Sequence, residues 1–194
     1  MKHILLTFTL ILFSISTFSQ EYSEVITLEG ISADRSYQLT KEWVALTYKS
    51  AQDVVKLDTP AKVIVKGTMA LPTQMYGMAY NWIIDHTITI AFKDNRIKMD
   101  LEIGRFTNSS YPQMNFPLPD YYLQKVDKQT YFVEMWEDQN VRNAGPKLRA
   151  KTEKNYGDQL YAQYLLDFEH YQNLIGNTFT SLNNYIIKST DDDW

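Results

Sequence analysis

The clearest pattern in the sequence is an alternation of apolar and polar positions between residues 82 and 103. Two alternating runs flank the polar segment Lys93-Asp94-Asn95-Arg96, in which Asp94-Asn95 is typical of a two-residue β-turn. Pairing residue 93 with residue 96 places apolar positions opposite apolar ones and polar opposite polar. The pattern therefore predicts a hairpin with one apolar face under helices and one polar face in water. The predicted inward residues are Ile84, His86, Ile88, Ile90 and Phe92, and the outward ones are Thr87, Thr89, Asp100 and Glu102.

Shorter patterns predict the elements that precede this hairpin. Ser32 is a suitable N-cap in front of an apolar arc with helical spacing, which is typical of an amphipathic helix. Pro72 and Gly77 favour a loop after a run of β-branched residues. In chain order we expect a strand at 24–29, a helix at 33–49, strands at 53–57 and 62–69, and a loop at 70–79.

The second half of the chain combines an irregular segment with a helix. Residues 107–157 read as an aromatic-rich insert, in which residues 131–136 are expected to form a strand and Pro146 to open a short helix. From Asp158 to Lys188 an apolar stripe predicts a long helix, followed by an acidic, frayed tail at 189–194.

The N-terminus has the pattern of a secretory signal peptide. Lys2 precedes about ten apolar residues, and small residues at 17 and 19 suit a cleavage site after Ser19. The apolar run is too short for a membrane-spanning helix, which needs about 20 residues. We therefore expect a signal peptide at 1–19, a domain at 20–188, and a mature chain that is periplasmic or secreted and has no membrane span.

Composition narrows the functional classes. The 194 residues include 19 Lys or Arg and 23 Asp or Glu, so the net charge is −4. An acidic balance argues against a nucleic-acid binder, which needs a basic face for phosphates. The absence of Cys excludes disulfides, Cys-zinc sites and thiol catalysis.

The predicted order β-α-β-β-β-β-α describes an α+β fold, with a curved antiparallel sheet and two helices on one face. Four segments resemble a known family: Lys41-Glu42-Trp43, Lys49-Ser50-Ala51-Gln52-Asp53-Val54-Val55, Val63-Ile64-Val65-Lys66-Gly67 and Lys93-Asp94-Asn95-Arg96. Over residues 22–106 the chain resembles exported bacterial proteins, mostly from Bacteroidota, that share a domain of unknown function with a fold like that of the TATA-binding protein (TBP-like). The resemblance implies that fold as a single unit, and it implies export. It supplies no catalytic residue.

Two histidines are candidates for chemistry. His86 is the one polar residue on the apolar face of its strand, and it is either a general base or a hydrogen-bonded histidine at the sheet's rim or under a helix end. The second reading is favoured, because no positioned partner is evident. His170 follows Asp167 by three residues, a spacing that could hold a metal weakly. No third ligand is suggested, so a solvated helix face is the better reading and no metal or cofactor is expected.

Carboxylates and aromatic residues complete the candidates. Asp85, Asp100 and Glu102 share the polar sheet face with Lys98; paired carboxylates could act as in glycosidases, but solvated charge pairs are the ordinary case. The aromatic residues gather around two predicted loops and either cover the sheet's edge or form a binding surface. The candidate binding residues are Tyr76, Tyr80, Trp82, Tyr121 and Tyr122, with Tyr111 and Phe116 beside them.

Two functions remain open from the sequence. The first is a non-catalytic binding or structural module of the bacterial envelope, whose partner is an envelope protein or a glycan. The alternative is a hydrolase of an envelope polymer that uses His86 or the sheet carboxylates. DNA binding would rest on analogy of fold alone, and both the net charge and the expected export oppose it.

Overall fold

The structure is a computed structural model that describes residues 20–75, 78–109, 115–116, 124–137 and 143–191. These residues form, in chain order, β1 (Gln20–Thr27), α1 (Ala33–Thr47), α2 (Ala51–Val54), β2 (Val55–Thr59), β3 (Lys62–Met75), β4 (Met78–Lys93), β5 (Arg96–Asn108), β6 (Asn115–Phe116), α3 (Lys128–Glu137) and α4 (Pro146–Asp191).

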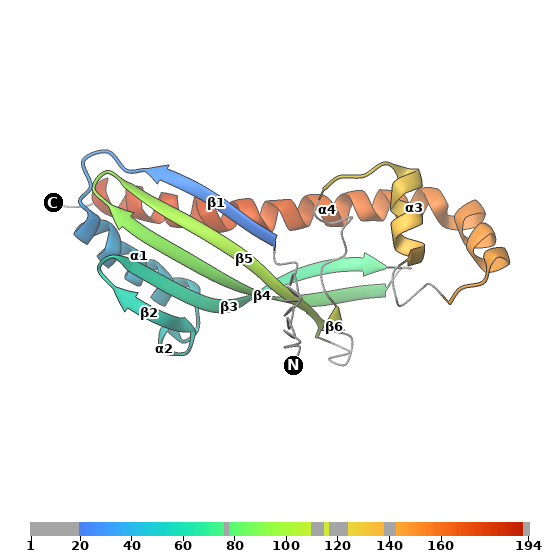
Figure 1. The fold of residues 1–194 in the computed structure, drawn as a ribbon, viewed down its shortest axis with the longest axis horizontal. Coiled ribbons are helices and arrows are strands. Elements are labelled where there is room, and N and C mark those ends of the chain that lie inside the picture. Colours follow the sequence, from blue (N-terminus) through green and yellow to red (C-terminus); the bar gives the residue numbers. More distant parts are fainter. Residues whose placement is uncertain (1–19, 76–77, 110–114, 117–123, 138–142, 192–194) are drawn as a thin grey trace, which may run out of the picture.

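Five strands form an antiparallel sheet in the order β1-β5-β4-β3-β2, and the short β6 pairs with the end of β5. Helices α1 and α4 pack together on one face of this sheet, and α4 runs along its whole length (Figure 1). The two helices are also joined directly, because the Trp43 indole N–H donates to Ser181 Oγ at 2.7 Å. The predicted α+β fold with two helices on one face is thus confirmed.

The β4–β5 hairpin has the predicted register. Lys93 pairs with Arg96, Phe92 with Ile97, and His86 with Ile103. The five predicted inward residues of β4 are buried, and the sheet's other face carries the Thr and charged residues. A register shift between Ile84 and His86 interrupts the ladder at Asp85. Alternation alone was sufficient here because a slip by one residue would expose the whole apolar face.

The β4–β5 turn also holds the start of α1. Asn95 has a φ of 63°, a backbone conformation that Asn tolerates better than most residues. Its side-chain Oδ1 accepts from the Gly30 N–H at 2.9 Å, and Asp94 Oδ1 accepts from the Ala33 N–H at 2.8 Å. The predicted N-cap is confirmed, because Ser32 Oγ accepts from the Arg35 N–H at 3.2 Å.

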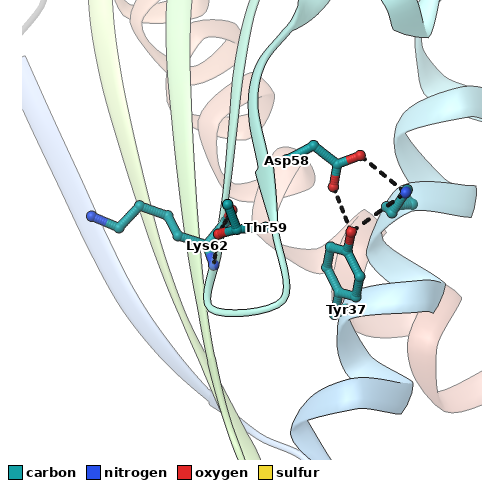
Figure 2. Close-up of polar contacts among 5 residues, drawn as sticks. Tyr37, Asp58, Thr59 and Lys62 are labelled. Atoms are coloured by element: carbon teal, nitrogen blue, oxygen red, sulfur yellow. Dashed lines mark hydrogen bonds and ion pairs between the residues drawn. The ribbon is translucent and has the colours of Figure 1, made fainter.

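A polar cluster joins α1 to the edge strand β2 (Figure 2). The Tyr37 hydroxyl donates to Asp58 Oδ1 at 2.7 Å, and Lys41 Nζ lies 3.0 Å from Asp58 Oδ2. Hydrogen bonds from Tyr37 and then Lys41 hold the pKa of Asp58 below its ordinary value. Thr59 Oγ1 both donates to the Lys62 carbonyl and accepts from the Lys62 N–H, which closes the β2–β3 turn.

Two predictions about the middle of the chain are wrong. Residues 70–79 were expected to form a loop, but β3 continues to Met75 and β4 begins at Met78. Among the described residues, β3 has no partner beyond Val65 on the β2 side, and proline is tolerated on such an edge, which explains Pro72 within the strand. Residues 131–136 were expected to form a strand and lie instead in helix α3.

Helix α4 differs from its prediction in length. One helix of 46 residues replaces the short helix at Pro146 and the separate helix at 158–188, and it includes Ser189–Asp191 of the predicted tail. Gly157 lies inside this helix beside Phe132 of α3, and a Cβ at this position would make only an ordinary van der Waals contact with the ring. None of the helices in the described part of the chain is long and apolar enough to cross a membrane.

Candidate functional site

Beyond the sheet, α3 and the first part of α4 build a second hydrophobic unit, which we call the head. The head contains its own set of buried side chains, separate from the core between the sheet and the helices. We call this set the aromatic cluster; its members are Val126, Tyr131, Phe132, Met135, Trp136, Leu160 and Tyr164. The head lies at the end of α4 that is remote from α1 (Figure 1).

Tyrosines fix the segment that leads into α3. The Tyr164 hydroxyl accepts from the Val126 N–H at 3.0 Å, and the Tyr161 hydroxyl donates to the Val126 carbonyl at 2.9 Å. The rings of Tyr131 and Tyr164 stack with centroids 4.7 Å apart. Asp127 then accepts from the Thr130 N–H at 2.9 Å, as an N-cap residue does, and this bond lowers its pKa. The entry to α3 is thereby anchored on α4.

Between α3 and α4 lies an open groove of about 540 Å³, here called the α3–α4 groove. Its lining residues are Lys128, Gln129, Phe132, Val133, Trp136, Glu137, Arg149 and Glu153. Val133 is 58% exposed at the groove, whereas Phe132 and Trp136 are buried and form its floor. The groove therefore offers an apolar centre with charges of both signs around it.

The polar groups of the groove are held in place by one another. The Trp136 indole N–H donates to Glu153 Oε1 at 2.5 Å, and the Arg149 guanidinium lies 5.6 Å from the centre of the Trp136 ring. Arg149 Nε also donates to the Ala144 carbonyl at 2.8 Å. Lys128 reaches Asp158 at 2.6 Å, and this hydrogen bond lowers the pKa of the Asp158 carboxyl. Such a preorganised rim suits recognition of a partner.

His86 is buried beneath the end of α1. It is 5% exposed, and its Nε2 lies 2.7 Å from the hydroxyl of Tyr48, the residue that caps α1. Burial lowers the pKa of His86 and raises the pKa of Tyr48 to about 12, so both are neutral at pH 7. Gly67 makes room for this pair, since a Cβ there would lie 2.5 Å from the Tyr48 ring. The hydrogen-bonded reading of this histidine is therefore the one that the structure supports.

The remaining titratable candidates lie apart from one another. On the open sheet face, Asp100 accepts a hydrogen bond from Ser23 at 2.6 Å and forms an ion pair with Lys98 at 2.8 Å. Burial alone would raise the pKa of Asp100, but the hydrogen bonds from Lys98 and Ser23 lower it. His170 is exposed, whereas Asp167 is 3% exposed and accepts from Gln163. Among the described residues, no group of three or more His, Asp or Glu could hold a metal ion.

The structure describes only part of the predicted aromatic surface. Tyr76, Tyr111, Tyr121 and Tyr122 lie outside the described residues. The backbone of Tyr80 pairs with that of Thr73 in the β3–β4 hairpin. The backbone of Phe116, in β6, pairs with that of Phe106 in β5. Trp82 lies in β4 and is half-buried, and its indole N–H donates to Thr73 Oγ1 at 3.1 Å. Trp82 therefore belongs to a strand pair and not to a loop.

The sequence did contain a signal for α3 that was read as a strand. The buried residues Tyr131, Phe132, Met135 and Trp136 follow one another at spacings of one, three and one, which is a helical spacing. Asp127 stands directly before the first helical residue and suits the N-cap. A groove lined by two helices is a tertiary feature and has no signal in either segment alone.

Comparison with known proteins assigns the first half of the chain. Among curated proteins, none is significantly similar in sequence. A DUF4468 family protein from Bacteroides ovatus ATCC 8483 is 15% identical, with a TM-score of 0.42 over 76% of this chain and 85% of that one. A TBP-like protein from Parabacteroides distasonis ATCC 8503 is 16% identical, with a TM-score of 0.44 over 86% of this chain and 94% of that one. Residues 22–107 match the family described as "Domain of unknown function (DUF4468) with TBP-like fold", so this part of the chain contains that domain.

Proposed function

We propose that this protein is an exported, non-catalytic binding module of the bacterial cell envelope, and that an envelope protein docks in its α3–α4 groove. One observation carries the proposal: α3 and α4 hold an open apolar groove on a unit with its own core, outside the residues that match the family. Binding residues often lie on segments added to a rigid scaffold, and here the scaffold is the sheet with α1 and α4.

Export is part of the proposal and rests on the sequence. Residues 1–19 have the length, charge and small-residue spacing of a signal peptide. Cleavage after Ser19 would leave the whole described range of β1, Gln20–Thr27, in the mature chain. We infer a periplasmic or secreted location from the sequence pattern of residues 1–19.

The chemistry of the groove favours a protein partner over a glycan. Aromatic side chains that bind sugars present an open ring face, but Trp136 is 8% exposed and Arg149 lies over its ring. Val133 instead offers an exposed aliphatic side chain between charges of both signs, as protein interfaces do. The aromatic residues Tyr76, Tyr80, Trp82, Tyr121 and Tyr122 are proposed as a second contact surface, to be tested separately by replacing the tyrosines with alanine.

The hydrolase alternative has less support. A general base must reach its substrate, but His86 is buried and its Nε2 is engaged by Tyr48. The carboxylate of Asp100 is engaged by Lys98 and Ser23 on an open sheet face. Neither group lines the α3–α4 groove.

The test uses two matched valines. Val133 in the groove and Val25 on β1 are both 58% exposed, so Val133→Asp and Val25→Asp add the same charge at equally accessible positions. The exported chain is cross-linked in the envelope, and the partner is identified by mass spectrometry, purified and titrated against each variant. Val133→Asp should weaken the affinity by about tenfold or more, as a charge in an apolar contact does, and Val25→Asp should not.

The same preparation tests export and the alternative function. The intact mass of the exported protein should correspond to a chain that begins at Gln20. Equal affinities of the two valine variants would refute the groove as the docking site. Hydrolysis of an envelope polymer that is lost in His86→Gln would replace the binding function by the hydrolase.

A further inference from the structure

The first turns of α4 present a row of exposed lysines. Lys147, Lys151 and Lys154 recur at intervals of four and three residues, which places them within about 60° of one another around the helix. All three are exposed, and none forms an ion pair with a described residue. We call this row the lysine face. It stands out in a chain whose net charge is −4.

An exposed apolar strip runs beside the lysine face. Leu148 and Tyr156 are 57% and 56% exposed, and Thr152 lies between them on the same side of the helix. The side of α4 that packs on α3 is a different one, marked by Gly157 and Leu160. The lysine face and the apolar strip are therefore accessible and use no residue that lines the α3–α4 groove, although they border it: Tyr156 lies one turn from Glu153, and Asp158, one turn after Lys154, pairs with Lys128.

The opposite end of α4 leads into a segment of complementary chemistry. The helix ends at Asp191, and Asp192, Asp193 and Trp194 follow in the sequence, outside the described residues. Three successive carboxylates match three lysines in charge and number. The indole that follows is a suitable partner for an exposed Leu and Tyr, because aromatic side chains provide most of the apolar contact in interfaces.

This segment cannot reach the lysine face of its own chain. Lys154 and Asp191 are separated by about 55 Å of continuous helix at 1.5 Å per residue. The three residues after Asp191 span at most about 10 Å. Figure 1 shows the two ends of α4 on opposite sides of the molecule.

We propose that the lysine face and apolar strip of α4 bind the Asp191-Asp192-Asp193-Trp194 segment of a second copy of this chain. The contact is head-to-tail, because the two surfaces that meet are different, and it leaves one free surface on each copy. Copies therefore add to one another in an open chain or close into a ring. The contact does not involve the groove and is independent of the function proposed above.

The experiment measures self-association of the exported chain by sedimentation velocity over a range of protein concentrations, at low and at high salt. Surface ion pairs are screened by salt, so association should weaken by about tenfold or more at high salt. Lys147→Glu with Lys151→Glu and Lys154→Glu should abolish association, and so should Asp191→Lys with Asp192→Lys and Asp193→Lys. A control with Lys49→Glu, Lys66→Glu and Lys93→Glu changes the charge equally at other exposed positions and should associate like the wild type.

A charge swap separates binding from loss of structure. The protein that carries the three Lys→Glu and the three Asp→Lys substitutions has opposite charges at the two ends again, so it should associate. In a separate variant, Trp194→Ala alone should weaken association. Absence of self-association at low salt, or a combined variant that stays monomeric although its circular dichroism is that of the wild type, would overturn the proposal. Binding to phosphatidylglycerol vesicles that is lost with the three lysines, without self-association, would overturn it in favour of a membrane surface.

Discussion

Burial keeps His86 neutral, and this makes its hydrogen bond to Tyr48 sensitive to acid. The imidazole contacts the one tyrosine that caps α1, so the pair ties the end of α1 to the centre of β4. Gly67 is the residue that permits it, because any side chain there would displace the Tyr48 ring. Three residues from three elements thus form a single structural unit.

The first prediction concerns pH. The pKa of His86 is lowered in the folded state, whereas the unfolded chain has an ordinary histidine pKa of about 6.5. The full stability is therefore present above about pH 6.5, and it is lost progressively as the pH falls through the folded-state pKa, because only the unfolded chain gains the proton readily. Urea midpoints at pH 7.5 and at lower pH should show a smaller loss for His86→Gln than for the wild type.

The control for this prediction is the exposed histidine. His170→Gln should lose as much stability on acidification as the wild type, since His170 lies on the outer side of α4. If His86→Gln and His170→Gln behave alike, His86 does not contribute to the acid sensitivity of the fold.

The β4–β5 hairpin is the element whose two faces differ most. Ile88 is fully buried between the sheet and the helices, whereas Thr89, one residue on, is partly exposed on the open face. Ile88→Asp should lower the free energy of unfolding by about 4 kcal/mol or more, because it buries an unpaired charge. Thr89→Asp should cost less than about 1 kcal/mol, although it places a carboxylate opposite Asp100. Equal shifts of the denaturation midpoint would contradict the assigned faces.

The same contrast explains which elements could be predicted from the sequence. The hairpin and α1 were predicted because their periodicity, turn residues and cap residue agree. α3 was missed because Tyr131, Phe132 and Val133 individually favour strands, and this preference outweighed the helical spacing of the buried residues and the N-cap residue Asp127. The long strands β3 and β4 were cut short because Pro72 and Gly77 are typical of loops, whereas pairing between the strands continues past Pro72 to Met75 and Met78.

The candidate site could not be predicted for a related reason. Its lining residues are separated in the sequence and come together only because α3 folds back on α4. The aromatic residues chosen from the sequence gather in segments rich in Pro and Gly, which is a local signal. The head, in contrast, depends on contacts such as that between Tyr131 and Tyr164.

The whole molecule contains two hydrophobic clusters that share α4. The larger cluster is closed by five strands and two helices, whereas the aromatic cluster is closed, among the described residues, by α3 and the segment before it. Hydrogen exchange should therefore be at least about tenfold faster for the amides of α3 than for those of central β4 and β5, because smaller units open more often. Equal protection would mean that the two clusters unfold as one.

The continuity of α4 has a consequence for how this protein can change in length. Each residue inserted between the two clusters would turn the head by about 100° about the helix axis and move it by about 1.5 Å. An insertion of one or two residues between Phe168 and Tyr171 would rotate the groove and the lysine face away from their present side of the sheet. Insertions of about seven residues, close to two full turns, would preserve the direction in which these surfaces point. The length of α4 therefore fixes the rotation of the head relative to the sheet. Only insertions or deletions close to whole helical turns would preserve this rotation.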